Sequence, residues 1–439
     1  MKLRSYISKP DWGHFGHETS NYIYRTLLLQ IFEEYRYSVS GSFSSSSSSY
    51  LVLSSNYSFQ KNMAGSFKHK LPLTLVLLSF LHFSGIISIN AQGLSKHGTL
   101  SKNISALLVF GDSTVDSGNN NFVRTTFKSN FPPYGREFPN QIPTGRFTDG
   151  RLCTDFIASY VGIKRDVPPY LDPTLSMREL MTGVSFASAG TGYDPLTPKL
   201  SNVIPISKQL EYFRDYKRRL QSATGKQRTK ILINNALFVV SAGTNDFVVN
   251  YFALPTRRKS YTVSSYQQFL LQHCKELIRG LWDEGARKIL VAGLPAMGCL
   301  PIVITLFSNS STVIHDQLQR RCLEQYSSVA RDYNRLLQND LNFMQLSLAS
   351  QGSRIFYLDI YEALIHMIED HERFGFDETN VGCCGTGYLE ASFLCNPKSY
   401  VCSDASKYIF WDSIHATEKA YYNVFNGTFR PIIDLIINN

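Results

Sequence analysis

The chain has 439 residues and a formal net charge of +9. So mild an excess of Lys and Arg does not indicate a nucleic-acid partner, and a solvated surface accounts for it. The length is enough for one elaborated α/β domain even when the N-terminal segments described next are set aside.

Two segments at the N-terminal end are not expected to belong to the folded domain. Residues 1–62 have no clear periodicity and contain a run of serines, which cannot bury apolar surface. We interpret them as a disordered or spurious extension. Residues 71–88 are apolar, follow two lysines and precede Ala91 as a small residue at a cleavage site, which predicts a signal peptide over residues 63–91. If the extension is retained, the alternative is a signal anchor, for which this apolar segment is short.

Residues 92–439 alternate strand-like and helix-like segments and are expected to form a single domain. Near-continuous apolar runs predict four buried strands, at residues 105–111, 236–242, 288–292 and 354–359. Segments of helical period predict helices at residues 207–220, 264–284 and 313–346. Continuous apolar strands fit a sheet covered on both faces, and strands separated by helices form parallel βαβ units. The predicted fold class is therefore α/β, a three-layer α/β/α domain with a mainly parallel central sheet.

Residues 289–307 are apolar enough to raise the alternative of a membrane span. Pro295, Pro301 and the glycines between them interrupt this run and instead predict a strand followed by a loop. We therefore expect no stable membrane span in the mature chain.

The 8 cysteines of the chain all follow residue 91. Their even number and the predicted secretory route favour disulfides. Four of them lie close together among Gly, Asn and Pro and predict a stapled loop: Cys383, Cys384, Cys395 and Cys402. A zinc site is the alternative, but no histidine lies among them at ligand spacing. The spacing leaves the pairing open, and we expect no metal and no cofactor.

Three sequons are candidate glycan acceptors in a secreted chain: Asn103, Asn309 and Asn426. Together with the signal peptide, they predict a secreted, extracellular glycoprotein.

Polar residues follow two of the predicted strands at the point where each strand ends. Ser113 closes the triplet at residues 111–113, where we expect a buried strand to give way to a turn and then a helix. Asn245 lies in the polar segment 243–246, after the second strand. Because functional residues gather at the carboxyl ends of parallel strands, both segments are expected at the same edge of the sheet.

Asp412 and His415 place a carboxylate and an imidazole three residues apart near the C-terminus. A serine, a histidine and an aspartate are the components of a nucleophilic hydrolase, in which the imidazole removes the proton of the serine. Each motif alone has a plainer interpretation, because Ser113 could cap a helix and the Asp-x-x-His pair could face solvent.

Four segments, in this order, together resemble a known family: residues 110–120, 185–192, 243–246 and 412–418. The chain is similar to the GDSL esterase/lipases, also called SGNH hydrolases, and in particular to their secreted plant branch. Residues 133–136, 143–147 and 293–301 also resemble that branch. The resemblance spans about residues 105–430, and it implies a flavodoxin-like α/β/α hydrolase fold.

The resemblance implies a role for each residue of the predicted site. Ser113 attacks the ester carbonyl, His415 takes the hydroxyl proton and returns it to the leaving alcohol, and Asp412 orients the imidazole. The developing oxyanion is bound by the N–H groups of Ser113 and Gly190 and by the side-chain NH₂ of Asn245. We expect Asp112 and Asp246, by contrast, to be structural.

The chain departs from the family pattern at four positions. Ser185 and Ala189 replace an asparagine and a glycine, which leaves open whether Gly190 or Ala189 supplies the main-chain donor. Ala416 replaces a proline and is expected to loosen the loop that holds His415. Cys153 stands where the family commonly has another residue, and it either pairs or remains free.

The implied function is a secreted serine ester hydrolase that cleaves acyl esters through an acyl-enzyme. The substrate is expected to be a lipid, a cutin-like ester or an acetylated polysaccharide. One alternative is an acyltransferase that uses the same acyl-enzyme, and another is a binding or defence protein that keeps the fold without the chemistry. A flavodoxin-like nucleotide binder is disfavoured, because the chain lacks a Gly-rich loop of the usual spacing.

Overall fold

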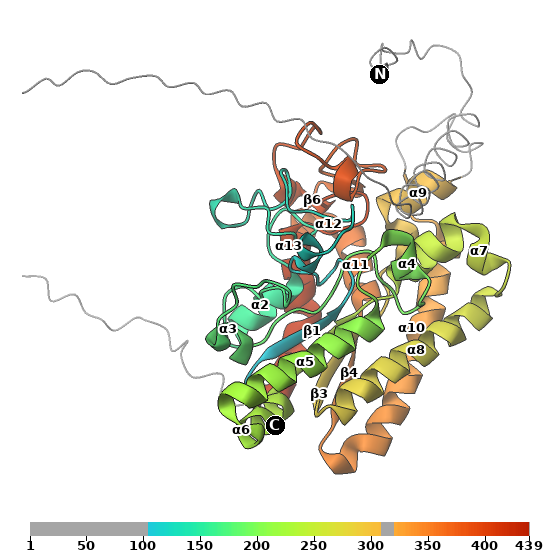
Figure 1. Ribbon diagram of the computed structural model, residues 1–439. Coiled ribbons are helices and arrows are strands. Elements are labelled where there is room, and N and C mark those ends of the chain that lie inside the picture. Colours follow the sequence, from blue (N-terminus) through green and yellow to red (C-terminus); the bar gives the residue numbers. More distant parts are fainter. Residues whose placement is uncertain (1–103, 309–319, 439) are drawn as a thin grey trace, which may run out of the picture. The chain divides into compact units, whose positions relative to one another are not determined.

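The computed structural model describes residues 104–308 and 320–438 (Figure 1). The predicted extension at residues 1–62, the predicted signal peptide at residues 63–91 and the sequons at Asn103 and Asn309 lie outside the described residues, so they remain predictions. Within the described part, no helix has both the length and the apolar character that crossing a membrane requires.

A parallel sheet of four strands forms the centre of the domain. The strands are β1 (Leu107–Gly111), β2 (Leu237–Ser241), β3 (Lys288–Ala292) and β4 (Arg354–Leu358), in the spatial order β1-β2-β3-β4. Every neighbouring pair is parallel, and the first three strands are almost completely buried. These are the four predicted strands, and the predicted α/β class is confirmed.

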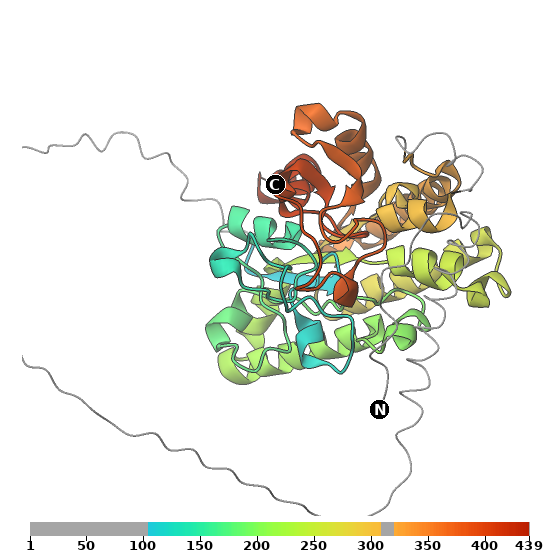
Figure 2. The ribbon, with the colours of Figure 1, turned by 90° about the horizontal axis from the view of Figure 1, so that it is seen from above.

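Helices cover both faces of this sheet, as the continuous apolar strands require. Helices α5 (Ile206–Thr224) and α8 (Val263–Asp283) lie on one face, and α11 (Ile360–Glu369) and α13 (Glu418–Val424) lie on the other (Figures 1 and 2). The predicted helices at 207–220 and 264–284 correspond to α5 and α8. The remaining α-helices of the described residues are α2 (Cys153–Tyr160), α3 (Met177–Met181), α4 (Thr197–Ser201), α6 (Lys226–Asn235), α7 (Pro255–Arg258), α9 (Pro301–Phe307), α10 (Glu324–Leu348), α12 (His371–Phe374) and α14 (Arg430–Asn438).

The third predicted helix, at residues 313–346, begins later than expected. Residues 313–319 lie outside the described part of the chain, residues 320–323 are not helical, and α10 begins at Glu324. Cys322 is bonded to Cys299, and the N–H of Leu323 donates to the carbonyl of Gly298 at 2.9 Å. These bonds hold residues 322 and 323 against the loop before α9, so the helical period of the sequence is overridden there.

The prediction of a loop after the third strand is wrong in part. The apolar run at 289–307 forms β3 and a connecting segment, and then helix α9 begins at Pro301. Proline has no N–H to donate and a fixed φ, and both properties suit the first position of a helix. Pro301 therefore starts a helix rather than extending a loop.

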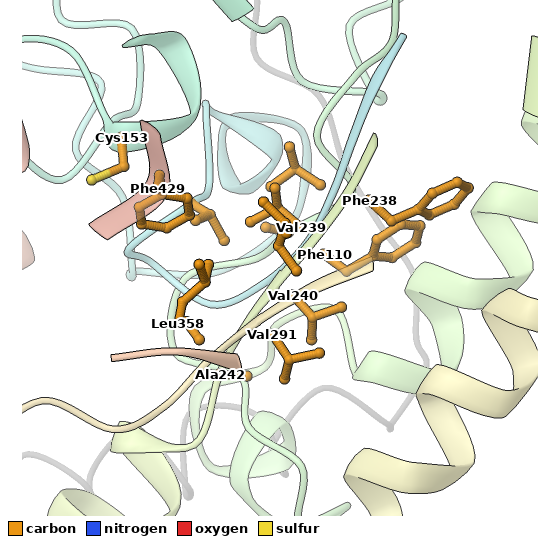
Figure 3. Close-up of a cluster of buried hydrophobic side chains, with 14 of the residues drawn as sticks. Phe110, Cys153, Phe238, Val239, Val240, Ala242, Val291, Leu358 and Phe429 are labelled. Atoms are coloured by element: carbon orange, nitrogen blue, oxygen red, sulfur yellow. The ribbon is translucent and has the colours of Figure 1, made fainter. Parts of the chain in front are cut away.

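The side chains of the strands alternate between the two faces and fill two layers of core. On one side, the Phe110 ring packs against Phe186 with ring centroids 5.0 Å apart and against Phe213 of α5 at 5.7 Å. Figure 3 shows Phe110 and Phe238 on this side and Leu358 and Phe429 on the other. The strand that leads to Ser113 is thus fixed by packing from both faces.

The edge of β1 that faces away from β2 is also hydrogen-bonded, to the segment at residues 184–188. Main-chain bonds join Val109 to Val184 and Phe186, at 3.1 and 2.8 Å, and the N–H of Ser188 donates to Gly111 at 2.9 Å. The segment before Gly190 therefore runs along β1 to the strand end where Ser113 lies.

A second, two-stranded parallel sheet pairs β5 (Glu378–Gly382) with β6 (Tyr408–Phe410). The segment between them, Cys383–Cys402, is called the disulfide loop below, because two disulfides close it. Since β6 ends two residues before Asp412, this small sheet delivers the C-terminal motif to the domain.

Gly111 provides a direct test of the packing of β1 against β2. Its φ is +139°, and a Cβ at this position would lie 1.8 Å from the carbonyl oxygen of Ser241. We expect Gly111→Ala to lower the free energy of unfolding by more than about 3 kcal/mol, since the strands must separate. Gly352→Ala is the matched control, because its φ is +78° but no atom of the described residues lies within 4 Å of the position that its Cβ would take; it is expected to cost about 1–2 kcal/mol. Urea unfolding of both variants measures the difference, and equal losses of stability would show that the close approach of β2 does not limit this position.

Candidate active site

Ser113 lies in a tight turn directly after β1. The N–H of Asp112 continues the ladder by donating to Ser241 at 3.0 Å. The carboxylate of Asp112 then accepts from the N–H and the hydroxyl of Thr114, at 3.0 and 2.8 Å. This turn places Ser113 at the end of the strand. The bonds of Asp112 agree with the structural role expected for it.

The helix expected directly after Ser113 is absent from this part of the described chain. The carboxylate of Asp116 accepts from the N–H groups of Gly118 and Asn119, at 2.8 and 2.7 Å, and only a 3-10 turn follows at Asn119–Phe122. Side-chain acceptors satisfy the main-chain donors locally and so compete with helix formation. Ser113 therefore caps no helix.

The structure brings Ser113, His415 and Asp412 into one chain of hydrogen bonds. Ser113 Oγ lies 2.8 Å from His415 Nε2. His415 Nδ1 lies 2.9 and 2.8 Å from the two carboxylate oxygens of Asp412. The side chain of Asp412 is fully buried, and that of His415 is 5% exposed.

The loop that carries His415 is fixed by hydrogen bonds to its main-chain groups. Asp412 Oδ1 accepts from the N–H groups of Ile414 and His415, at 2.9 and 2.8 Å. The N–H of Trp411 donates to the carbonyl of His415 at 2.7 Å. The carbonyl of Ala416 accepts from a threonine hydroxyl at 2.9 Å. These bonds hold the loop at Ala416, the position where the family pattern has a proline.

Sequence reasoning gave no role to Tyr134, although the segment 133–136 was part of the resemblance. Its phenol donates to Asp412 Oδ2 at 2.8 Å, and the side chain is buried. Burial and the charge of Asp412 raise the pKa of Tyr134 well above its usual range. The phenol therefore stays protonated and remains a donor.

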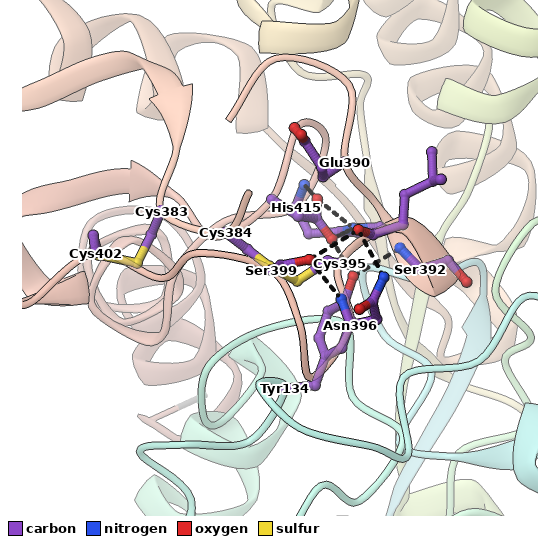
Figure 4. Close-up of a disulfide and its surroundings, with 12 residues drawn as sticks. Tyr134, Cys383, Cys384, Glu390, Ser392, Cys395, Asn396, Ser399, Cys402 and His415 are labelled. Atoms are coloured by element: carbon purple, nitrogen blue, oxygen red, sulfur yellow. Dashed lines mark hydrogen bonds and ion pairs between the residues drawn. A yellow bond between two sulfur atoms is a disulfide. The ribbon is translucent and has the colours of Figure 1, made fainter. Parts of the chain in front are cut away.

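The four clustered cysteines form disulfides, so the zinc alternative is wrong. The pairs are Cys383–Cys402 and Cys384–Cys395 (Figure 4). The N–H of Cys384 donates to the carbonyl of Trp411 at 2.8 Å. The disulfide loop is therefore bonded to the residue that precedes Asp412.

The main-chain donors near Ser113 are distinguished by their partners. The N–H of Ala189 donates to Asp116 at 3.0 Å. Among residues 104–308 and 320–438, the N–H groups of Ser113 and Gly190 have no acceptor. The side chain of Asn119 donates to the carbonyl of Ala187 at 2.8 Å and so helps to fix this segment. Of the two candidates left open by the sequence, Gly190 is the one whose N–H is uncommitted.

Asn245 follows β2, the strand that pairs with β1. Its NH₂ group donates one hydrogen bond, to the carbonyl of Thr191 at 2.9 Å, which orients the amide. The second N–H of the group is left available for another acceptor. The neighbouring Asp246 accepts from the N–H of Tyr193 at 2.7 Å and from the hydroxyl of Thr197 at 2.5 Å. The bonds of Asp246 agree with the structural role expected for it.

Two of the departures from the family pattern have simple packing explanations. The hydroxyl of Ser185 donates to the carbonyl of Val115 at 2.9 Å and so joins the two segments beside β1. Cys153 is free and buried, and its thiol donates to the carbonyl of Tyr421 at 3.0 Å. Burial raises the pKa of this thiol, so it is a packing residue rather than a reactive one.

Comparison with known sequences decides the family. The profile of the GDSL-like lipase/acylhydrolase family matches residues 107–427. The chain belongs to this family. It is 60% identical over 336 residues to GDSL esterase/lipase At5g45960 of Arabidopsis thaliana, which covers 76% of this chain and 88% of that relative. It is 46% identical over 316 residues to GDSL esterase/lipase At1g06990 of the same plant, which covers 72% and 86%. Carboxylic ester hydrolysis is accordingly its class of reaction.

The buried carboxyl of Asp112 makes the stability of this family member depend on pH. Burial raises the pKa of Asp112 from 3.8 to about 6. The folded state therefore keeps a proton that the unfolded state releases, so this group makes the free energy of unfolding fall as the pH rises from about 4 to about 6.

Asp112→Asn tests this dependence, because an amide oxygen can still accept both bonds from Thr114 but carries no titrating proton. Between pH 3 and pH 7 the wild type is expected to lose up to about 3 kcal/mol more stability than the variant. Urea unfolding at a series of pH values measures both slopes. Parallel slopes would show that Asp112 keeps an ordinary pKa in the fold.

Proposed function

We propose that the protein hydrolyses acyl esters through an acyl-enzyme on Ser113, with His415 as general base and acid and Asp412 as the group that orients the imidazole. The observation that supports this most directly is the unbroken chain of bonds from Ser113 Oγ through the imidazole to Asp412, with contacts of 2.8 Å at each end. Such a chain is the arrangement that converts a serine hydroxyl into a nucleophile at neutral pH.

In the first step, Ser113 Oγ attacks the ester carbonyl while its proton passes to His415 Nε2. The Oγ–C bond forms as the π electrons of the carbonyl move to its oxygen. The imidazolium that results keeps its Nδ1 proton toward Asp412, whose buried negative charge stabilises it. Because both Asp412 oxygens lie within 2.9 Å of Nδ1, the neutral imidazole presents its lone pair at Nε2, toward the serine.

The oxyanion is stabilised by the three donors at the edge of the sheet. The N–H groups of Ser113 and Gly190 are uncommitted among the described residues, and the amide of Asn245 has one proton to spare. Donors that are fixed before the reaction need not reorganise when the transition state forms. The tetrahedral species then expels the alcohol, which takes the proton of His415, and water repeats the sequence to release the acid.

We propose that the acyl group is carried by a lipid, a cutin-like ester or an acetylated polysaccharide, and that the enzyme acts outside the cell. The three disulfides support the secretory route, because such bonds persist in oxidising compartments. Asn426 is exposed, as a glycan acceptor must be. A series of p-nitrophenyl esters of increasing chain length, assayed beside acetylated xylan, separates the lipid-like substrates from the polysaccharide.

Ser113→Ala tests the nucleophile. We expect the wild type to react with a fluorophosphonate probe and the variant to be unlabelled, with ester hydrolysis reduced at least about a thousandfold. Ser117→Ala is the matched control, because Ser117 is also buried and its hydroxyl has no partner among the described residues. Labelling of folded Ser113→Ala at the wild-type rate would overturn the proposal.

Asn245→Ala tests the third oxyanion donor. Its kcat is expected to fall about a hundredfold with little change in KM, since the donor acts on charge that develops only in the transition state. Asn245→Asp keeps the size of the side chain without its N–H and should lose as much. A loss confined to KM would instead indicate that Asn245 binds the substrate in its ground state.

A further inference from the structure

The phenol of Tyr134 occupies a position between the catalytic carboxylate and the disulfide loop. It donates to Asp412 Oδ2 at 2.8 Å and accepts from the N–H of Ser392 at 2.8 Å. Its side chain is 1% exposed, so water does not compete for either bond. Figure 4 shows Tyr134 near Ser392, with both disulfides to one side of them.

The two oxygens of the Asp412 carboxylate are held in different ways. Main-chain N–H groups of Ile414 and His415 fix Oδ1. Among the described residues, Oδ2 has only the phenol of Tyr134 and the imidazole itself as partners. Without Tyr134, the imidazole itself would be the sole partner of Oδ2 among the described residues, so the plane of the carboxylate, and the imidazole bonded to it, would be held less firmly.

Ser392 is itself anchored from several directions. It lies between Cys384 and Cys395, which are bonded to each other. Its hydroxyl accepts from the N–H of Lys128 at 3.2 Å and lies 3.2 Å from the carbonyl of Thr126. The disulfide loop thus presents the Ser392 N–H at a fixed point.

The disulfide loop also binds the main chain on both sides of Asp412. The N–H of Cys384 donates to the carbonyl of Trp411 at 2.8 Å, and the N–H of Ser413 donates to the carbonyl of Glu390 at 2.8 Å. One loop therefore fixes the backbone around Asp412 and, through Ser392, the phenol that fixes its side chain.

We propose that Tyr134 is a positioning residue for Asp412, and that the disulfide loop holds its phenol in place through Ser392. This inference rests on the proposed function of Ser113, His415 and Asp412. Tyr134 touches neither the nucleophile nor the imidazole through any bond in the described structure, so it acts on the reaction only through the carboxylate.

Tyr134→Phe is the first test, because it removes one hydroxyl and keeps the ring. We expect kcat to fall about 10- to 100-fold, as for a hydrogen bond to a buried charge, with KM unchanged because the substrate site is untouched. The rate of fluorophosphonate labelling should fall by a similar factor. Tyr216→Phe is the matched control: Tyr216 is equally buried, and its hydroxyl donates to the carbonyl of Leu180 in another part of the core at 2.6 Å.

The comparison separates positioning from stability. Urea unfolding of both variants gives the loss of stability, and only Tyr134→Phe is expected to lose kcat. Equal kcat values for the two variants, or a change in KM alone, would overturn the assignment. If Ser113→Ala is inactive while Tyr134→Phe matches the wild type, only this inference fails; if Ser113→Ala stays active, the proposed function fails.

Ser392→Gly tests the part played by the loop. Glycine tolerates the φ of +51° at this position and keeps the N–H, but it removes the hydroxyl that anchors the loop to residues 126–128. We expect a severalfold loss of kcat in the wild-type background and a smaller loss in Tyr134→Phe, because the part of the effect that acts through the phenol is already lost there. Independent, multiplicative losses would show that Ser392 does not act through Tyr134.

Discussion

The parallel pairing of β1 with β2 is the constraint on which the site depends. Gly111 lies level with Ser241, so close that no side chain fits between them. This register sets the point at which both strands end, and Ser113 and Asn245 leave the sheet at the same edge because of it. The segment that ends at Gly190 is bonded along the free side of β1 and reaches the same edge. The β1–β2 register and the segment bonded along the other side of β1 therefore bring Ser113, Asn245 and Gly190, the proposed oxyanion donors, to one edge.

His415 and Asp412, the proposed base and its carboxylate, come from a separate part of the chain. A small second sheet and the disulfide loop deliver the segment with Asp412 and His415, and the bonds of Asp412 to its own main chain turn the imidazole toward Ser113. The site thus joins a rigid sheet edge to a cross-linked loop. Burying a carboxylate is costly unless it is fully bonded, and the donors around Asp412 meet that requirement.

The sequence was sufficient for the parts of the fold that depend on local pattern. The four strands are continuous apolar runs, and such runs can be recognised in the sequence without knowledge of distant contacts. The helix expected after Ser113 failed because the carboxylates of Asp112 and Asp116 satisfy main-chain donors that a helix would use. Tyr134 could not be found from spacing, because its partner Asp412 is 278 residues away and only the folded chain brings them together. The choice of Gly190 over Ala189 likewise depended on the bond to Asp116.

In the proposed mechanism, one sheet edge holds the nucleophile and the three oxyanion donors in place before the substrate arrives. A crystal structure of the protein with a phosphonate bound covalently to Ser113 tests it most directly. We predict that the phosphoryl oxygen lies about 2.7–3.1 Å from the main-chain nitrogens of Ser113 and Gly190 and from the side-chain nitrogen of Asn245. A phosphoryl oxygen directed away from these three nitrogens, into solvent or toward His415, would contradict it.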